Sequence, residues 1–398
     1  MTDADTKTGH IRLARRLDDI PPYLFQRIDD LKAEACRKGI KVISLAIGDP
    51  DLPTPPDIVE ELYKQAQINE NQKYPAYKGI PEFRKAVAGF YERRFGIGLN
   101  PDTECLALIG SKEGIANLAL AVLDPEDIVI VPDPCYPVYP MHAVFIGCES
   151  YTVPLRREND FLIDFGEIPD KVCERAKLLW MNYPNNPTSA VAPLEFFNDA
   201  VRWAKKWGVV LAHDNPYSEI YQSEAPPPSL LNAEGAMDVA IEFNSLSKSY
   251  NMTGWRVGMA VGNAEIVQAL GRVKSNIDSG VFVPIQIAAA KALNKPLDAT
   301  EGLRAKYAER RKAVEEVLES AGYDVYRGKG TFYLWSRTPM GMSSMEFIGR
   351  VIEETGIVIG PGSGWGAAGE GFFRICLTRE ADELRQHVRT LVEKFPVD

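Results

Sequence analysis

A lysine flanked by hydroxyl residues and followed by an arginine marks the most reactive stretch of this chain. Lys248 lies in the run SLSKSYNMTGWRVG, which occupies residues 245–258 between two apolar, strand-like segments. Its amine could form an imine with an aldehyde, while Ser245, Ser247 and Arg256 offer hydroxyl groups and a guanidinium suited to a phosphate. The run therefore predicts a covalently held, phosphate-bearing aldehyde. The alternative is a serine-rich turn with an ordinary solvated lysine.

Further polar and aromatic residues follow the preceding apolar segments, at the points where strands would end. Ligands of open α/β sheets bind beyond the carboxyl ends of the strands. After Ile109, the sequence GSKEG opens a helix whose free backbone N–H groups could bind an anion beside Ser111 and Lys112. After Val131, a proline-rich turn fixes Tyr136, which could stack on a flat heterocycle. An ordinary helix cap and a packed core tyrosine are the alternatives.

Two more strand ends carry groups that could hold such a ring. After Met181, the sequence NYPNNPT presents Asn186, whose amide could contact a phenolic oxygen or a carboxylate; turn formation is the alternative. After His213 comes Asp214, and an acid at the end of a buried strand is costly to ionise without a cation. A pyridinium N–H would supply that partner, and Tyr217 could donate to the neighbouring ring oxygen. Asp214 could instead cap a helix or form an ion pair, and we expect His213 to be a core residue.

The elements that must position these residues have the pattern of an α/β fold with a mostly parallel sheet, because short apolar runs alternate with segments of helical periodicity. The predicted strands are Glu104–Ile109, Asp127–Val131, Lys177–Met181, Val209–His213, Val239–Phe243 and Val257–Val261. The predicted helices between them are Lys112–Ala121, Tyr139–Phe145, Leu194–Trp207 and Ala264–Lys274.

The pattern of predicted helices and strands changes after about residue 285, where a long charged helix over Glu301–Glu319 precedes short strands and further helices. A chain of 398 residues is too long for one small core. We therefore expect a large ligand-binding domain over 48–285 and a smaller α+β domain over 286–398. The segment 1–47 is expected to form an N-terminal arm and part of the small domain.

Bulk composition excludes several classes of function. The formal net charge of −10 argues against nucleic acid or an anionic membrane as the main partner. The six cysteines form no CxxC pair, and the four histidines show no metal-ligand spacing with them, so we predict free thiols and no metal site. The first residues lack an apolar signal region, and no run is long enough to span a membrane. We expect a soluble, cytoplasmic protein.

Taken together, the motifs resemble those of the class I and II aminotransferases, which are fold type I enzymes dependent on pyridoxal 5′-phosphate. The resemblance runs from about Ile20 to the C-terminus. Its most specific motifs are NNPT at 185–188, DNPY at 214–217, SK at 247–248, GWRVG at 254–258 and FRI at 373–375. One departure is Ser189, where family members usually have glycine. The resemblance implies a large domain with a mostly parallel, seven-stranded-type sheet between helices, a smaller α+β domain and a homodimer.

The resemblance also implies how the cofactor would be held. Lys248 would bind it covalently and carry the proton, Asp214 would pair the ring nitrogen, and Tyr136 would stack on the ring. Tyr217 and Asn186 would hydrogen-bond the ring oxygen. The residues that would contact the phosphate are Ser111, Lys112, Ser245, Ser247, Arg256 and, across a dimer interface, Tyr74.

The substrate side of the site is implied in the same way. Arg374 would grip the α-carboxylate, for which a planar two-pronged guanidinium is suited. The other implied substrate-binding residues are Tyr23, Gly48, Lys112 and Asn186. The phrases LDDIPPYLF, SLAIGDPD and GSKEG look like those of LL-diaminopimelate aminotransferases, which would exchange an amino group between LL-2,6-diaminopimelate and 2-oxoglutarate in lysine biosynthesis. Alanine-type and broad-specificity relatives share these phrases, so an alanine, aspartate or aromatic aminotransferase is the alternative, followed by a C–S lyase and a non-catalytic sensor module.

Overall fold

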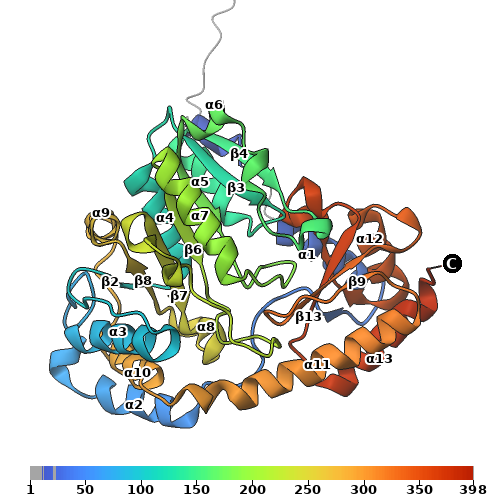
Figure 1. The fold of residues 1–398 in the computed structure, drawn as a ribbon. Coiled ribbons are helices and arrows are strands. Elements are labelled where there is room, and N and C mark those ends of the chain that lie inside the picture. The colour runs from blue at the N-terminus through green and yellow to red at the C-terminus, as the bar shows by residue number, and fades with distance from the viewer. Residues whose placement is uncertain (1–10, 12, 21–23, 398) are drawn as a thin grey trace, which may run out of the picture.

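The computed structural model describes residues 11, 13–20 and 24–397, and the side chains from residue 28 onward in the last of these ranges. A large sheet covered by helices lies beside a smaller part with its own sheet and helices (Figure 1). Within this described part of the chain, no helix is both long enough and apolar enough to cross a membrane.

The large sheet is mostly parallel and has the strand order β2-β8-β7-β6-β5-β3-β4. Its strands are β2 (Cys105–Leu108), β3 (Ile128–Asp133), β4 (Glu149–Pro154), β5 (Ala176–Met181), β6 (Val210–Asp214), β7 (Ala240–Ser245) and β8 (Gly258–Gly262). In this sheet β8 runs antiparallel to its neighbours β2 and β7, and the other pairs are parallel. The carboxyl ends of β2, β3, β5, β6 and β7 therefore meet the amino end of β8 at one edge. The predicted fold class is confirmed.

Helices pack on both faces of this sheet, because successive strand residues point to opposite sides. Ile128 and Ile130 join one hydrophobic core, while Val129 and Val131 join another. The helices of this part are α2 (Pro56–Ala66), α3 (Pro81–Phe95), α4 (Ser111–Val122), α5 (Val138–Ile146), α6 (Asp170–Cys173), α7 (Leu194–Trp207), α8 (Leu246–Ser249), α9 (Ala264–Lys274) and α10 (Val283–Leu293). The helix α10 packs against α2 and α3.

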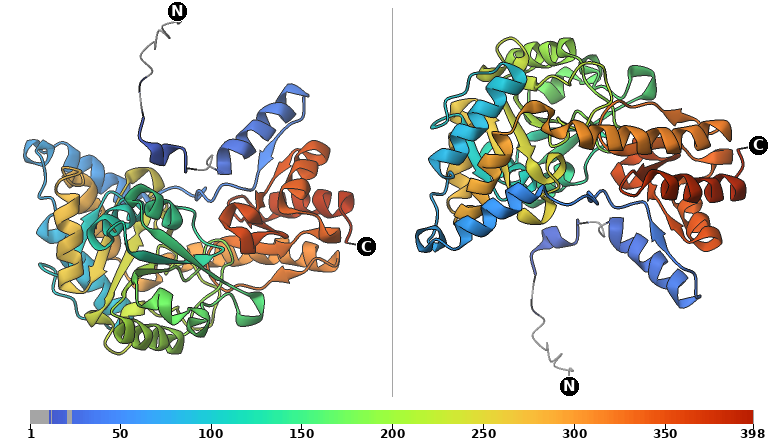
Figure 2. Two further views of the ribbon diagram at one scale, coloured as in Figure 1. Left: turned by 90° about the horizontal axis from the view of Figure 1, so that it is seen from above. Right: turned by 90° about the horizontal axis from the view of Figure 1, so that it is seen from below.

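The smaller part combines both ends of the chain. Its antiparallel sheet has the order β12-β13-β10-β9, and β1 pairs with β11 in parallel. The strands are β1 (Ile43–Ser44), β9 (Val325–Tyr326), β10 (Tyr333–Arg337), β11 (Ile357–Val358), β12 (Gly360–Pro361) and β13 (Phe372–Cys376). The helices are α1 (Leu24–Arg37), α11 (Glu301–Ser320), α12 (Ser344–Thr355) and α13 (Ala381–Lys394). Figure 2 shows α1 projecting from the body of the molecule.

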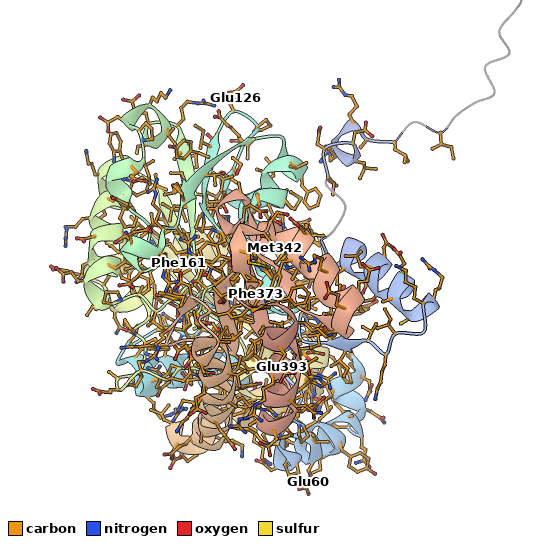
Figure 3. All side chains as sticks on the ribbon, turned by 90° about the vertical axis from the view of Figure 1, so that its right-hand side faces the viewer. Glu60, Glu126, Phe161, Met342, Phe373 and Glu393 are labelled. Atoms are coloured by element: carbon orange, nitrogen blue, oxygen red, sulfur yellow. The ribbon has the colours of Figure 1, made fainter. Side chains whose placement is uncertain are left out.

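Each of the two parts has a core of buried apolar side chains, and charged side chains lie on the surface. Phe161 and Phe373 lie in the interior, whereas Glu60 and Glu126 lie at the periphery (Figure 3). Phe161 belongs to the core of the large sheet and Phe373 to that of the smaller part. Full burial of each such ring stabilises the fold by about 1.5–3 kcal/mol. The core of the large sheet also joins the two parts, because it includes residues of the smaller part, namely Trp335, Trp365 and Phe372.

Candidate active site

A cavity of about 290 Å³ lies at the edge of the large sheet where the strand ends meet, and residues of the smaller part close it. The predicted site residues that line it are Gly48, Ser111, Lys112, Tyr136, Asn186, Asp214, Tyr217, Ser245, Ser247, Lys248, Arg256 and Arg374. Two predicted residues are not among them. Tyr74 is 89% exposed on the surface of the single chain. Tyr23 lies outside the described residues.

Lys248 is placed in this cavity by the junction of β7 and α8. The Ser245 hydroxyl accepts the backbone N–H of Ser247 at 3.2 Å, which caps the helix just before the lysine. The Nζ atom of Lys248 donates to the carbonyl oxygen of Gly48 at 2.8 Å. Burial lowers the pKa of Lys248 to about 8, and the charge of Asp49 opposes that shift. An amine with this pKa can act as a nucleophile and as a proton carrier near neutral pH.

Asp214 has one carboxylate oxygen engaged and the other free. The Tyr139 hydroxyl donates to Oδ2 at 2.8 Å, whereas Oδ1 is buried and has no hydrogen-bond partner in the described part of the chain. The residue is only 4% exposed, and burial raises its pKa to about 6, although the hydrogen bond from Tyr139 partly offsets this. A buried acceptor without a donor is costly. The free oxygen therefore fits a cationic N–H group such as a pyridinium.

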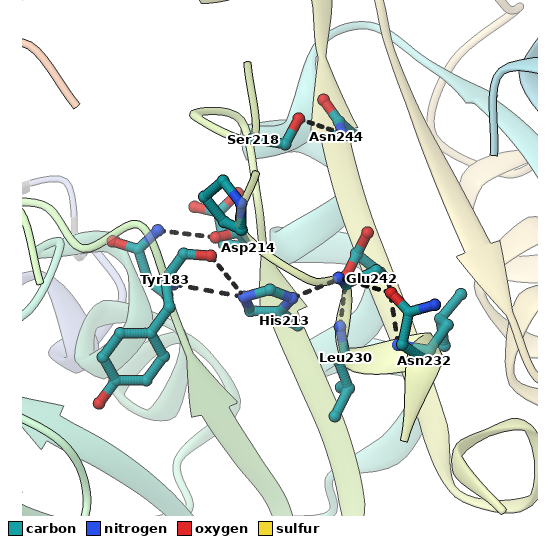
Figure 4. A network of polar contacts seen from close by, with 12 residues as sticks. Tyr183, His213, Asp214, Ser218, Leu230, Asn232, Glu242 and Asn244 are labelled. Atoms are coloured by element: carbon teal, nitrogen blue, oxygen red, sulfur yellow. Dashed lines mark hydrogen bonds and ion pairs between the residues drawn. The ribbon is translucent and has the colours of Figure 1, made fainter. Parts of the chain in front are cut away.

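A polar network lies behind Asp214 on the other face of the sheet (Figure 4). The Nδ1 atom of His213 lies 2.7 Å from a carboxylate oxygen of Glu242, and its Nε2 atom lies 2.9 Å from the carbonyl oxygen of Tyr183. Burial opposes ionisation of Glu242, but its hydrogen bonds with His213 and Tyr91 hold its pKa below the ordinary value. His213 and Glu242 are fully buried, which confirms the expectation that His213 is a core residue.

Groups suited to the oxygen and the face of a flat ring lie in the same cavity. The hydroxyl groups of Tyr217 and Tyr333 are 2.8 Å apart, and burial raises the pKa of both phenols. Tyr136 is half-buried, and its ring meets that of Tyr139 edge-on at 5.8 Å. The Asn186 amide oxygen accepts a hydrogen bond from Arg374 at 2.6 Å. Asn186 therefore connects the segment after β5 with β13 of the smaller part.

The start of α4 and the turn before β8 bring together donor groups that suit an anion. Gly110 precedes α4 with φ 81°, and a Cβ atom built there would overlap the Arg256 guanidinium. The Arg256 Nη1 atom donates to the carbonyl oxygen of Thr253 at 2.9 Å, which orients the guanidinium. Free N–H groups at the start of a helix, a guanidinium and hydroxyl groups together suit a phosphate. The glycine leaves the space that this arrangement needs.

The cavity also contains residues that the sequence analysis missed. Asp49, Tyr333 and Trp365 line it, and Tyr139 lies directly behind Asp214. Tyr139 lies in the first turn of α5, three residues after Tyr136, so its closeness in sequence to a predicted site residue could have indicated it. Tyr333 and Trp365 come from the smaller part and have no local signal in the sequence.

Comparison with known proteins finds aminotransferases that match nearly the whole chain. The family model for class I and II aminotransferases matches residues 40–391. The LL-diaminopimelate aminotransferase of Aquifex aeolicus is 54% identical over 93% of this chain and 95% of its own length. That of Dehalococcoides mccartyi is 49% identical, over 96% of this chain and 98% of its own.

Solved structures agree over nearly the whole chain. Substrate-bound BacF from Bacillus subtilis superposes with a TM-score of 0.93 at 35% identity, covering 98% of this chain and 99% of that chain. A probable N-succinyldiaminopimelate aminotransferase from Thermus thermophilus gives a TM-score of 0.89 at 37% identity, covering 93% and 99% of the two chains.

Proposed function

The chain belongs to the class I and II aminotransferases, and from this premise we propose that its reaction transfers an amino group between LL-2,6-diaminopimelate and 2-oxoglutarate. The family makes it a pyridoxal-phosphate-dependent transaminase. Nearly full-length relatives that carry the name LL-diaminopimelate aminotransferase support the choice of substrate. The observation that carries the assignment of the site is one cavity that holds both Lys248, with its lowered pKa, and the free Oδ1 of Asp214.

The donor and acceptor groups of the cavity fit pyridoxal 5′-phosphate. We assign the ring nitrogen to Asp214, the ring oxygen to Tyr217 and Asn186, and the ring face to Tyr136. The phosphate is assigned to Ser111, Lys112, Ser245, Ser247, Arg256 and, from a second subunit, Tyr74. When bound, the cofactor supplies an electron-accepting ring that stabilises the negative charge left on Cα after a proton is removed.

The residues of the chain would bind the substrate and move the proton. Lys248 takes the Cα proton at Nζ and returns it, because burial leaves part of its amine unprotonated near neutral pH. Asp214 stabilises a proton on the ring nitrogen through its free Oδ1. Arg374 binds the α-carboxylate, while its bonds to the Asn186 amide and the carbonyl oxygen of Ala46 orient the guanidinium. Gly48 lines the cavity and lets the backbone approach the same carboxylate. Lys112 lines it as well.

A homodimer and a cytoplasmic location complete the proposal. Tyr74 and Tyr77 are exposed, and Gly280 lies against Pro75 and Ala76, next to the exposed Phe282. Such a group of exposed apolar side chains suits a subunit interface. A second subunit on this surface would let Tyr74 reach the neighbouring site. The six cysteines are free, as expected in a reducing compartment.

The test is turnover of the cofactor-loaded protein with 2-oxoglutarate and a panel of amino donors. We expect kcat/KM for LL-diaminopimelate to exceed the values for alanine, aspartate and phenylalanine by at least about tenfold, or about 1.4 kcal/mol of transition-state binding. A higher value for another donor would overturn the substrate and keep the reaction class. Elimination of a thiol, with pyruvate and ammonia, from cysteine S-conjugates without transamination would point to a C–S lyase instead.

A further inference from the structure

Arg374 is a buried cation without an acidic partner. Its side chain is 3% exposed, and in the described part of the chain it forms no ion pair with an Asp or Glu within 4.0 Å. Its hydrogen-bond acceptors are neutral, namely the Asn186 amide at 2.6 Å, the Ala46 carbonyl oxygen at 2.8 Å and the Cys376 sulfur at 3.4 Å. Its Nε atom is buried without a partner among the described residues. Buried charges are ordinarily paired, so another interaction must stabilise this one.

Two aromatic rings supply that interaction. The Arg374 Cζ atom lies 4.1 Å from the centroid of the Tyr333 ring and 4.2 Å from that of the Trp365 ring. Both distances are well inside the range of cation–π attraction, which is stronger at desolvated sites. Both rings are buried and line the cavity. An aromatic face stabilises the charge without neutralising it, so no carboxylate of the protein competes with a carboxylate of the ligand.

The surroundings hold the two rings in place. The Trp365 ring packs edge-on against Trp335 at 6.0 Å, and Gly360 leaves the space that it occupies. The Tyr333 hydroxyl bonds Tyr217 at 2.8 Å, and Gly48 leaves the space above its ring. Rings fixed in this way restrict the rotation of the guanidinium.

We propose that Trp365 and Tyr333 are positioning residues that stabilise the buried charge of the Arg374 guanidinium and orient it for a ligand carboxylate. This inference rests on the proposed function, because it takes Arg374 as the carboxylate-binding group. Loss of a ring should weaken binding of every carboxylate ligand without slowing the proton transfer. Such a loss of uniform binding raises KM and leaves kcat nearly unchanged.

The test compares Trp365→Met, Trp365→Phe and the control Trp335→Phe. Trp335 is buried in the same aromatic cluster and lies opposite Arg374 in the β10–β13 ladder, but it does not line the cavity and its ring makes no cation–π contact with Arg374. Calorimetry measures the affinity for glutarate, a dicarboxylate that cannot be transaminated, with and without bound cofactor. We expect Trp365→Met to weaken glutarate binding about tenfold, equivalent to about 1.4 kcal/mol. Trp365→Phe should recover most of the affinity, because it keeps an aromatic face.

The second ring gives an independent comparison. Tyr333→Phe keeps the face and loses only the hydrogen bond to Tyr217, so its glutarate affinity should stay close to that of the wild type. Tyr333→Met should weaken glutarate binding as Trp365→Met does. This pair keeps the test decisive if Trp365→Met does not fold.

Two outcomes would overturn the inference. One is an unchanged glutarate affinity in both methionine variants. The other is an equal loss in Trp335→Phe, which would make the effect one of packing. Wild-type protein that binds glutarate but transaminates no amino acid would overturn the proposed function, while the affinities of the variants would still support the role of the rings.

Discussion

At the scale of single residues, burial drives the two central ionisable groups of the cavity toward their neutral forms. It lowers the pKa of Lys248 to about 8 and raises that of Asp214 to about 6. A cation bound at the free oxygen of Asp214 would lower the pKa of this residue again, because it stabilises the charged carboxylate. The hydrogen bond from Tyr139 already favours the charged carboxylate. Ligand binding and protonation are therefore coupled at this site.

That coupling predicts the pH dependence of cofactor affinity. Asp214 is ionised above about pH 6, so the affinity should fall as the pH drops through that value and the carboxylate takes up a proton. In Tyr139→Phe the stabilising donor is lost, so the pKa of Asp214 rises and the fall should begin at a higher pH. Fluorescence titration of the cofactor-free protein measures this. The control is Tyr323→Phe, which removes a buried hydroxyl that donates to the Phe395 carbonyl oxygen; an equal shift there would contradict the role of Tyr139.

Replacement of Lys248 tests the proton carrier. Lys248→Ala should reduce kcat by at least about 10³-fold, because it removes both the covalent link and the general base. Borohydride reduction followed by peptide mass mapping should locate the cofactor on Lys248 in the wild type. A cofactor attached elsewhere in the wild type would refute the assignment.

Replacement of Arg374 tests substrate binding. Arg374→Lys should raise KM for both amino donor and 2-oxo acid by about 10- to 100-fold, because an ammonium cannot form two parallel hydrogen bonds to a carboxylate. Steady-state kinetics with LL-diaminopimelate as amino donor and 2-oxoglutarate as acceptor measure the change. Unchanged KM values would remove Arg374 from the substrate site.

At the scale of elements, the direction of the strands explains why separate motifs meet. The strands β2, β3, β5, β6 and β7 all end at one edge, and β8 begins there because it runs in the opposite direction. Arg256, just before β8, therefore reaches Gly110, just after β2. This contact joins two segments that are far apart in the chain and that carry the groups proposed to bind the phosphate.

The contact predicts the effect of a single methyl group. Gly110→Ala should displace the Arg256 guanidinium and weaken binding of pyridoxal 5′-phosphate at least about tenfold, while pyridoxal itself, which has no phosphate, is bound as before. Gly147→Ala is the matched control, because Gly147 has φ 85° and no atom within 4 Å of a Cβ. It should lower the free energy of unfolding by about 1 kcal/mol without changing cofactor affinity. Equal losses of affinity would show that backbone strain alone is responsible.

At the scale of the whole molecule, the site combines residues from both parts and, in the proposed dimer, from two subunits. Arg374 bonds Asn186 across the boundary between the parts, and Tyr74 points to a further subunit by its exposure. The boundary predicted near residue 285 stays a prediction. The side chains of Ala288 and Leu293 belong to the core of the large sheet, which favours a later boundary.

Mixed subunits test the proposed dimer. Neither Lys248→Ala nor Tyr74→Ala should have full activity alone, but a heterodimer of the two has one site with both native residues if Tyr74 acts across the interface. We expect co-expression to restore about half of the wild-type activity per heterodimer. Light scattering confirms the subunit number. No gain above the single variants would place Tyr74 outside the neighbouring site.

The sequence predicts helices and strands correctly where the residues that define an element and its ends lie within or next to that element. The predicted ranges Leu194–Trp207 and Ala264–Lys274 match α7 and α9, because apolar periodicity and residues such as Gly208 and Asn263 define their ends. The sequence analysis did not predict the edge strand Glu149–Pro154. This strand pairs with a neighbour on one side only, and most of its side chains are at least partly exposed, so it lacks the apolar run of a buried strand.

The sequence by itself determined which reactive groups stand at the strand ends, and hence the kind of cofactor that they suit. The tertiary structure decided which of those groups are left without partners. Tyr139 bonds one carboxylate oxygen of Asp214 and leaves the other without a donor, and the buried guanidinium of Arg374 lies against the rings of Tyr333 and Trp365. Burial and pairing arise between segments far apart in the chain, so they appear only once the chain is folded.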